Sequence, residues 1–210
     1  MKYNNHEHGA GGVMEEQRVK SLSEMSNEEL WQLFPIVIKE YNPVYQTWYA
    51  DSKDEIYTIL GTEKIKRINH IGSTAVPGLV SKPTVDILLE IDINSDIEDI
   101  KKQLGNNGWI CMHEERQPQL HLIFNRGYTI HGFAERVYHL HVRFLGDWNE
   151  LYFRDYLIAH PEVAKEYGLL KCKLMKTYEH NRDGYTEAKT SFVKEFTDMA
   201  REEFGERYKQ

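Results

Sequence analysis

The residues with the clearest chemical potential lie near the middle of the chain, around a loop that joins two apolar segments. Gly72 and Ser73 precede this loop, which is rich in proline and glycine, and Asp86 follows it in the next apolar segment. Small residues allow a ligand to approach the backbone closely, and an aspartate in this place is suited to hold a metal ion. This layout is typical of a site that binds phosphate groups.

A second group of candidate ligands is the pair His139 and His141, separated by one residue in a predicted strand. Alternate residues of a strand point to the same face, so both imidazoles would project together. This spacing is suited to zinc, nickel or manganese, and Glu135 would share the face if the strand begins early enough. The alternative is that one histidine is a hydrogen-bonded partner on a half-buried sheet.

Cationic side chains form a third group, because arginine binds phosphate in a bidentate manner and lysine supplies a point charge. If Arg182 begins the last helix or immediately precedes it, then Arg182, Tyr185 and Lys189 fall on one helical face. Ordinary ion pairs with nearby acids such as Asp155 are the competing explanation. The predicted phosphate-binding set consists of Lys82, Arg154, Lys171, Arg182, Tyr185 and Lys189.

These motifs resemble those of the GrpB family, a branch of the DNA polymerase beta-like nucleotidyltransferase superfamily. The resemblance extends over roughly residues 33–195, with its most specific parts at 70–86 and 185–189. The histidine pair also looks like the family's His-x-His strand. The resemblance implies a nucleotidyltransferase-like fold in which Gly72 and Ser73 contact phosphates and Asp86 holds a catalytic metal ion.

The sequence departs from the superfamily pattern at the second metal-binding acid, because Leu88 stands two residues after Asp86. Glu90 shares the strand face, but a rise of about 3.3 Å per residue puts its Cα roughly 13 Å from that of Asp86. We therefore interpret Glu90 as a solvated strand end unless a bulge brings it closer. Asp86, His139 and His141 then form either a 2-His-1-carboxylate metal cluster or a polar phosphate pocket.

Composition narrows the classes of partner. The chain has 210 residues and a net charge of −7, which argues against extended nucleic-acid binding but allows a small phosphorylated ligand. No stretch is apolar enough for a bilayer span or a signal peptide. Two cysteines, Cys111 and Cys172, cannot build a disulfide framework, so we expect them to pack as small apolar side chains in a cytoplasmic protein.

The elements that must position these residues are predicted from apolar periodicity and capping signals. Residues 1–20 are predicted as a flexible tail and 21–210 as a single domain. Helices are predicted after a Ser26 cap and at 43–60, 96–104 (capped by Ser95), 149–160, 161–178 and 186–208. Strands are predicted at 65–71, 84–91, 109–113, 120–125 and 135–145, with 34–38 as a strand or extended arm and a turn at 125–127. The fold class is α+β, with a mixed β-sheet flanked by helices and a helical C-terminal third.

The leading hypothesis is a nucleotidyltransferase-fold protein that binds a nucleotide or another phosphorylated metabolite. If catalytic, it would transfer a nucleotidyl group with Mg²⁺, for which Mn²⁺ or Zn²⁺ are alternatives. A different reading is a non-catalytic nucleotide sensor or accessory module that has the pocket without the metal centre. A third is a metal-dependent phosphohydrolase that uses the His139–His141 strand.

Overall fold

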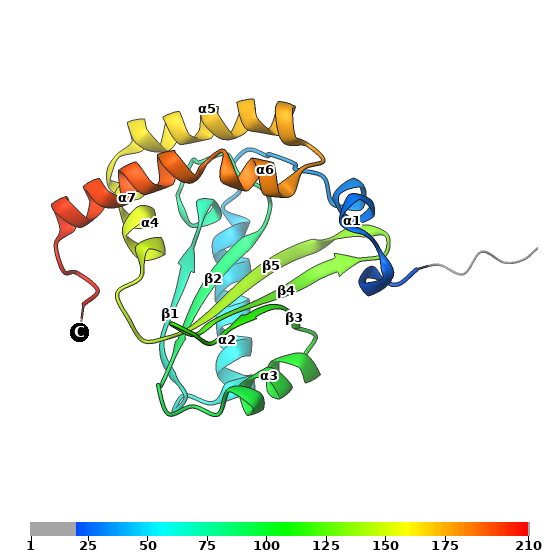
Figure 1. Cartoon of the computed structure of the whole chain (residues 1–210). Coiled ribbons are helices and arrows are strands. Elements are labelled where there is room, and N and C mark those ends of the chain that lie inside the picture. Colours follow the sequence, from blue (N-terminus) through cyan, green and yellow to red (C-terminus); the bar gives the residue numbers. More distant parts are fainter. Residues whose placement is uncertain (1–19, 210) are drawn as a thin grey trace, which may run out of the picture.

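The computed structural model describes residues 20–209, which are built around a five-stranded mixed sheet (Figure 1). The strand order is β1-β2-β5-β4-β3; β2 and β5 run parallel, and the other neighbouring pairs run antiparallel. The predicted tail lies outside the described residues except for Lys20. The strands are β1 (Ile65–Ile71), β2 (Val85–Ile91), β3 (Ile110–Glu115), β4 (His121–Thr129) and β5 (Gly132–Phe144).

Helices cover both faces of the sheet, and the C-terminal helices gather at the end where β1 stops and β2 begins (Figure 1). The helices are α1 (Asn27–Leu33), α2 (Val44–Leu60), α3 (Ile97–Asn106), α4 (Asn149–Ala159), α5 (Pro161–Tyr178), α6 (Arg182–Glu187) and α7 (Thr190–Phe204). Two short 3₁₀ turns span Leu22–Glu24 and Ser73–Ala75. The α+β class and the helical C-terminal region are confirmed. Within residues 20–209, no helix combines the length and apolarity needed to cross a membrane.

The two faces of the sheet differ in polarity because strand residues alternate between them. One face is apolar, and its fully buried side chains, among them Leu89 and Leu140, pack in one cluster with Ile56 of α2 and Ile100 of α3. The other face carries the polar residues of β2 and β5, including Asp86. The apolar core therefore holds the strands in register, and the opposite face carries both Asp86 and the buried residues Leu88 and Glu90.

Two predicted boundaries at the helices are wrong. The N-cap of α3 is Asp96 rather than Ser95, because the Asp96 carboxylate accepts hydrogen bonds from the backbone amides of Glu98 and Asp99. The predicted last helix is divided into α6 and α7. The Asn181 side chain accepts a hydrogen bond from the Gly184 amide and so starts α6 before residue 186.

Three further expectations are corrected at the sheet and its edges. Of the two alternatives for residues 34–38, a strand or an extended arm, the strand is wrong: the segment is neither strand nor helix, and the chain makes an isolated β-bridge just beyond it, between Lys39 and Ser81. The predicted turn at 125–127 lies inside β4, which continues to Thr129 through an irregularity in its pairing with β5. Cys111 is exposed rather than packed, because both faces of the edge strand β3 lie outside the core.

Candidate functional site

The strand register places the beginning of the loop beside the candidate aspartate. Ile71, the last residue of β1, pairs with Asp86 of β2, and Asp86 pairs in turn with His139 of β5. Gly72 follows with φ 69°, and a Cβ added there would lie 2.4 Å from the Asp86 Oδ2 atom. The backbone conformation and the close approach of the carboxylate both require glycine at this position.

A buried hydrogen-bond chain closes the loop between β1 and β2. The Thr74 hydroxyl donates to the Thr84 carbonyl oxygen at 3.0 Å, and His70 Nε2 lies 3.0 Å from the Thr74 hydroxyl. Burial lowers the pKa of His70 to about 4, so the ring is neutral at physiological pH and donates from Nε2 to Thr74. These bonds hold Ser73 and Asp86, at the two ends of the loop, close together.

Asp86 is oriented by a histidine and a tyrosine. His139 Nδ1 lies 3.0 Å from Asp86 Oδ1, and His139 Nε2 lies 2.7 Å from the Tyr128 hydroxyl. Burial acts to raise the pKa of Asp86, but the hydrogen bond from His139 and nearby positive charge lower it to about 2. The ionised carboxylate can only accept, so Nδ1 donates to Asp86 and Nε2 of the neutral ring accepts from Tyr128. Both ring nitrogens of His139 are therefore engaged.

Of the predicted group of Asp86, His139 and His141, only Asp86 and His139 are in direct contact. Burial lowers the pKa of His141, and its buried Nδ1 has no hydrogen-bond partner among the described residues. Within residues 20–209, the ligating atoms of Asp86, His139 and His141 do not all lie within 4.8 Å of one another. Glu135 lies on β5 but is exposed. This geometry favours a polar pocket over a three-ligand metal cluster.

Lysines from three separate segments surround Asp86, and burial depresses the pKa of each. The pKa of Lys82 falls to about 8, and repulsion by Arg182 and Lys189 adds to the effect of burial. The pKa of Lys171 falls to about 7, and that of Lys189 to about 8. The Asp86 carboxylate acts on all three lysines in the opposite direction. We call the group formed by Lys82, Lys171, Arg182 and Lys189 around Asp86 the cationic pocket.

Contacts with the loop and with aromatic rings hold these lysines in place. Lys171 is 3% exposed, and its ammonium group donates to the Ser73 hydroxyl at 2.8 Å and to the Val80 carbonyl oxygen at 2.5 Å. The Lys189 ammonium lies 4.4 Å from the centroid of the buried Tyr185 ring, and that of Lys82 lies 6.0 Å from it. Tyr185 thus serves as an aromatic support for two cations.

Of the predicted arginines, Arg182 belongs to the cationic pocket and Arg154 does not. Arg182 lines a small cavity together with Lys82 and Tyr128. The Arg154 guanidinium is bonded instead to Asp155, to the His70 carbonyl oxygen and to other neighbours. For Arg154, the competing explanation of an ordinary ion pair matches these contacts.

The interpretation of Glu90 as a solvated strand end is wrong. Its side chain is fully buried, where it forms a bidentate ion pair with Arg67 and accepts a hydrogen bond from the Gly146 amide at 3.1 Å. The partner comes from the neighbouring strand, since Arg67 pairs with Glu90 in the β1–β2 register. Leu88 is also fully buried and packs against Leu151 of α4. The acids present therefore do not fit a centre with two metal ions.

An open groove extends from the site along the polar face of the sheet. Its lining includes Gly72, the residue before Ser73, and Val193, Thr197 and Arg201 of α7. The groove has a volume of about 610 Å³, within the range of small-molecule sites. Its lining includes Arg143 and the aromatic residues Trp148 and Phe153. The cationic pocket is thus adjacent to a space large enough for the rest of a ligand.

Tyr128 is the site residue that sequence reasoning missed. The pairing between β4 and β5 shifts between Arg126 and Tyr128, so that Tyr128 pairs with Phe133 and lies on the same face as His139. Strict alternation from Asn125, which pairs with His139, would have put Tyr128 on the other face. Gly127, with φ 92°, marks the irregularity and was the signal for it, although we interpreted it as a turn.

Comparisons with known proteins agree with the geometry. The model of the GrpB protein family matches residues 35–199. The UPF0157 protein YqkA of Bacillus subtilis is 30% identical over 171 residues, which are 79% of this chain and 48% of that protein, so the match spans about half of its length. The glutamate-rich protein GrpB of Alkalihalophilus pseudofirmus is 31% identical over 163 residues, covering 76% of this chain and 92% of that protein.

A solved structure supports the same fold. The crystal structure of the conserved protein GrpB from Enterococcus faecalis superposes with a TM-score of 0.69 at 24% identity, covering 80% of this chain and 99% of that one. At this identity the likeness establishes the fold alone. Taken with the family match over residues 35–199, which exceeds half of the chain, it leads to one conclusion: this chain belongs to the GrpB family.

Proposed function

We propose that this chain binds a nucleotide or a similar phosphorylated metabolite, with the phosphate groups in the cationic pocket. The observation that carries the proposal is the imbalance of charge around Asp86. Lys82, Lys171 and Lys189 bring amino groups with lowered pKa values into a poorly hydrated space, where Asp86 is the carboxylate that acts on all three. In a chain with a net charge of −7, such a local excess of cations is unfavourable unless an anion balances it.

The shape of the site suits a ligand with several phosphate oxygens. Ser73 offers a hydroxyl beside the Lys171 ammonium, and Arg182 adds a planar group able to bind two oxygens at once. The adjacent groove, with Trp148 and Phe153 in its lining, would accept the base and sugar of a nucleotide. A glycine–serine pair that directly follows β1, beside an aspartate on the neighbouring strand β2, is compatible with the nucleotidyltransferase-like fold that the resemblance implies.

Binding without transfer is favoured over magnesium-dependent nucleotidyl transfer. Asp86 together with phosphate oxygens would hold a single Mg²⁺, with Mn²⁺ or Zn²⁺ as alternatives. In-line transfer between two metal ions needs further carboxylates, and neither Leu88 nor the paired Glu90 supplies one. A sensor or accessory module is therefore the form of the proposal that the residues support best. A phosphohydrolase that uses His139 as a metal ligand gains no support, because both ring nitrogens are engaged.

The test combines binding and turnover on the same protein. Thermal unfolding is recorded with ATP, GTP, CTP, UTP and inorganic triphosphate, with and without Mg²⁺, while pyrophosphate release is followed in parallel. We expect stabilisation by at least one of these anions and no pyrophosphate release. Release that disappears in Asp86→Asn would establish transfer instead. If none of the five anions raises the unfolding temperature, the proposal is wrong.

A further inference from the structure

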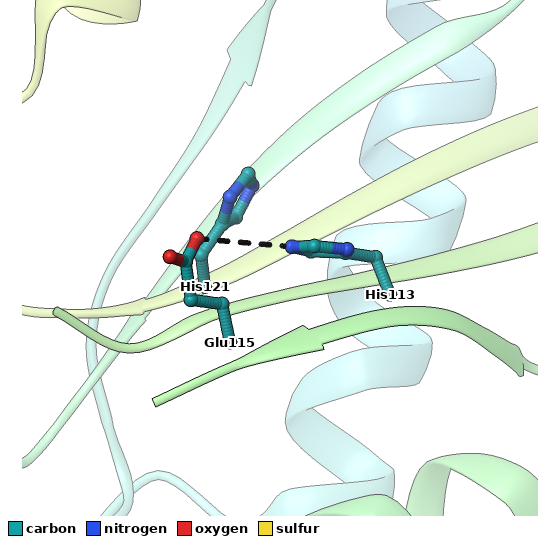
Figure 2. A group of neighbouring side chains, drawn as sticks. All are labelled: His113, Glu115 and His121. Carbon is teal, nitrogen blue, oxygen red and sulfur yellow. Dashed lines mark ion pairs between the residues drawn. The ribbon is translucent and has the colours of Figure 1, made fainter. Parts of the chain in front are cut away.

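A second group of ligating side chains lies on the hairpin formed by β3 and β4. His113, Glu115 and His121 project toward one another from the two strands (Figure 2). Glu115 pairs directly with His121, and His113 lies two residues before Glu115 on the same strand. The cationic pocket is built from other residues, which belong to the loop before β2, to β2 itself and to the C-terminal helices. The His121 ring stacks on that of His141 of β5, with the ring centroids 5.9 Å apart.

The donor atoms already lie near the spacing that a metal ion requires. One ligand atom from each of the three residues lies within 4.8 Å of the other two. In a tetrahedral site with metal–ligand bonds of about 2.0–2.1 Å, ligand atoms are separated by about 3.3 Å. The shift needed is about 1.5 Å at most, and the side chains of His113 and Glu115 are 49% and 51% exposed, so they are free to make it.

Few hydrogen bonds occupy the atoms of this group that could bind a metal ion. His113 Nε2 and Glu115 Oε2 are 3.9 Å apart, too far for a hydrogen bond. His121 Nε2 is buried and has no hydrogen-bond partner in the described part of the chain. A buried imidazole nitrogen without a partner beside two further donors points to a missing ligand.

We propose that His113, Glu115 and His121 bind a divalent cation of the zinc class. Two imidazoles and one carboxylate form a donor set that suits Zn²⁺ better than Mg²⁺, which prefers oxygen ligands alone. With three protein ligands, a fourth coordination position faces solvent, because both faces of β3 are exposed. The cation would also tie the edge strand β3 to β4 beyond their backbone hydrogen bonds.

The experiment is a titration of the full chain, first freed of metal with a chelator, with Co²⁺ and then with Zn²⁺ in competition. Visible absorption of bound Co²⁺ reports coordination by nitrogen and oxygen without any assay of activity. The variants are His113→Ala, Glu115→Gln and His121→Ala, with His131→Ala, an exposed histidine outside the group, as the matched control. His113→Ala is the safest variant for folding, because its side chain is exposed.

Two other variants test whether metal-binding side chains elsewhere in the chain account for the bound ion. His6→Ala/His8→Ala removes the N-terminal histidines, and Asp86→Asn removes the carboxylate of the cationic pocket. We expect about one Zn²⁺ to bind per chain. Loss of a residue that only hydrogen-bonds to a metal ligand typically weakens metal binding by about 10- to 100-fold. Replacing His113 or His121, which would be ligands themselves, should weaken it by more. The control, the N-terminal variant and Asp86→Asn should bind like the parent chain. Absence of binding, or binding that His113→Ala leaves unchanged, overturns the proposal.

Discussion

At the scale of single residues, the site depends on charged groups that have lost much of their water. Asp86 remains ionised because His139 donates a hydrogen bond to it. Burial lowers the pKa values of the surrounding lysines. Residue types near one loop were sufficient to propose Gly72, Ser73, Lys82 and Asp86, since these types suit phosphate binding. Their protonation could not be predicted, because it depends on burial by helices far away in the sequence.

Anion binding should weaken as pH rises from 7 to 9. Lys82, Lys171 and Lys189 have pKa values of about 8, 7 and 8, so they lose protons in this range, whereas an ordinary lysine titrates near 10.4. A bound anion favours the protonated forms, and binding at pH 8 should therefore take up protons. Calorimetry in two buffers with different ionisation enthalpies measures this uptake. An affinity that is constant from pH 7 to 9, without proton uptake, would contradict the charges assigned to these lysines.

Replacing Gly72 with alanine should remove ligand binding and destabilise the fold. The new Cβ would lie 2.4 Å from Asp86 Oδ2 at a φ of 69°, so both the carboxylate and the loop must shift. We expect a loss of about 1–3 kcal/mol in the free energy of unfolding and at least a tenfold loss of nucleotide affinity. Gly78→Ala is the matched control, because it has a similar φ of 78° but no neighbour within 4 Å. Equal nucleotide affinity for the two variants would show that the contact with Asp86 is unimportant.

At the scale of elements, local patterns predicted the strands and helices more reliably than the contacts between them. The apolar runs of β1 and β2 and the alternation of β5 gave correct strands, because those signals lie within one segment. The face of Tyr128 and the partner of Glu90 were missed for a different reason. Both depend on the register between strands, which is fixed by the whole sheet and leaves little trace in a single segment.

The ion pair between Glu90 and Arg67 should support stability without contributing to ligand binding. Removing one partner leaves the other charge buried and unpaired, so Glu90→Gln should lower the free energy of unfolding by about 3–5 kcal/mol. Nucleotide affinity should be unchanged at temperatures where the variant is folded. Denaturant unfolding and calorimetry measure the two effects, and Arg67→Met/Glu90→Leu should recover much of the stability. A loss of metal-dependent nucleotide binding in Glu90→Gln would instead assign this carboxylate to the site.

At the scale of the whole molecule, the proposed binding site and the apolar cluster formed with α2 and α3 lie on opposite faces of one sheet. The apolar face packs with α2 and α3, while the C-terminal helices approach the polar face and deliver Lys171, Arg182 and Lys189 to the end of the loop (Figure 1). The sequence predicted that these cations belong together through the family resemblance. For Arg154 the sequence left two alternatives, phosphate binding or an ion pair with Asp155, and the contacts with Asp155 and with the His70 carbonyl oxygen of β1 match the second.

This arrangement implies a conflict between stability and binding. Lys189→Met removes a charge that burial disfavours, so the ligand-free protein should become more stable. The gain should be on the order of 1 kcal/mol, because the side chain is only partly buried. The same change should weaken triphosphate binding. Thermal unfolding with and without inorganic triphosphate checks both effects together. A variant that is less stable and yet binds normally would indicate that Lys189 is a structural residue.

The central claim is that the cationic pocket binds phosphate groups, and calorimetric titration of the full chain with inorganic triphosphate tests it most directly. The parent chain is compared with Lys82→Met, Lys189→Met and the control Lys194→Met, which removes an exposed lysine that pairs with Asp198 on α7. We predict that each pocket variant loses at least about tenfold in affinity, or 1.4 kcal/mol, while the control binds like the parent. Equal affinities for all four proteins, or no measurable binding by the parent chain, would contradict the account.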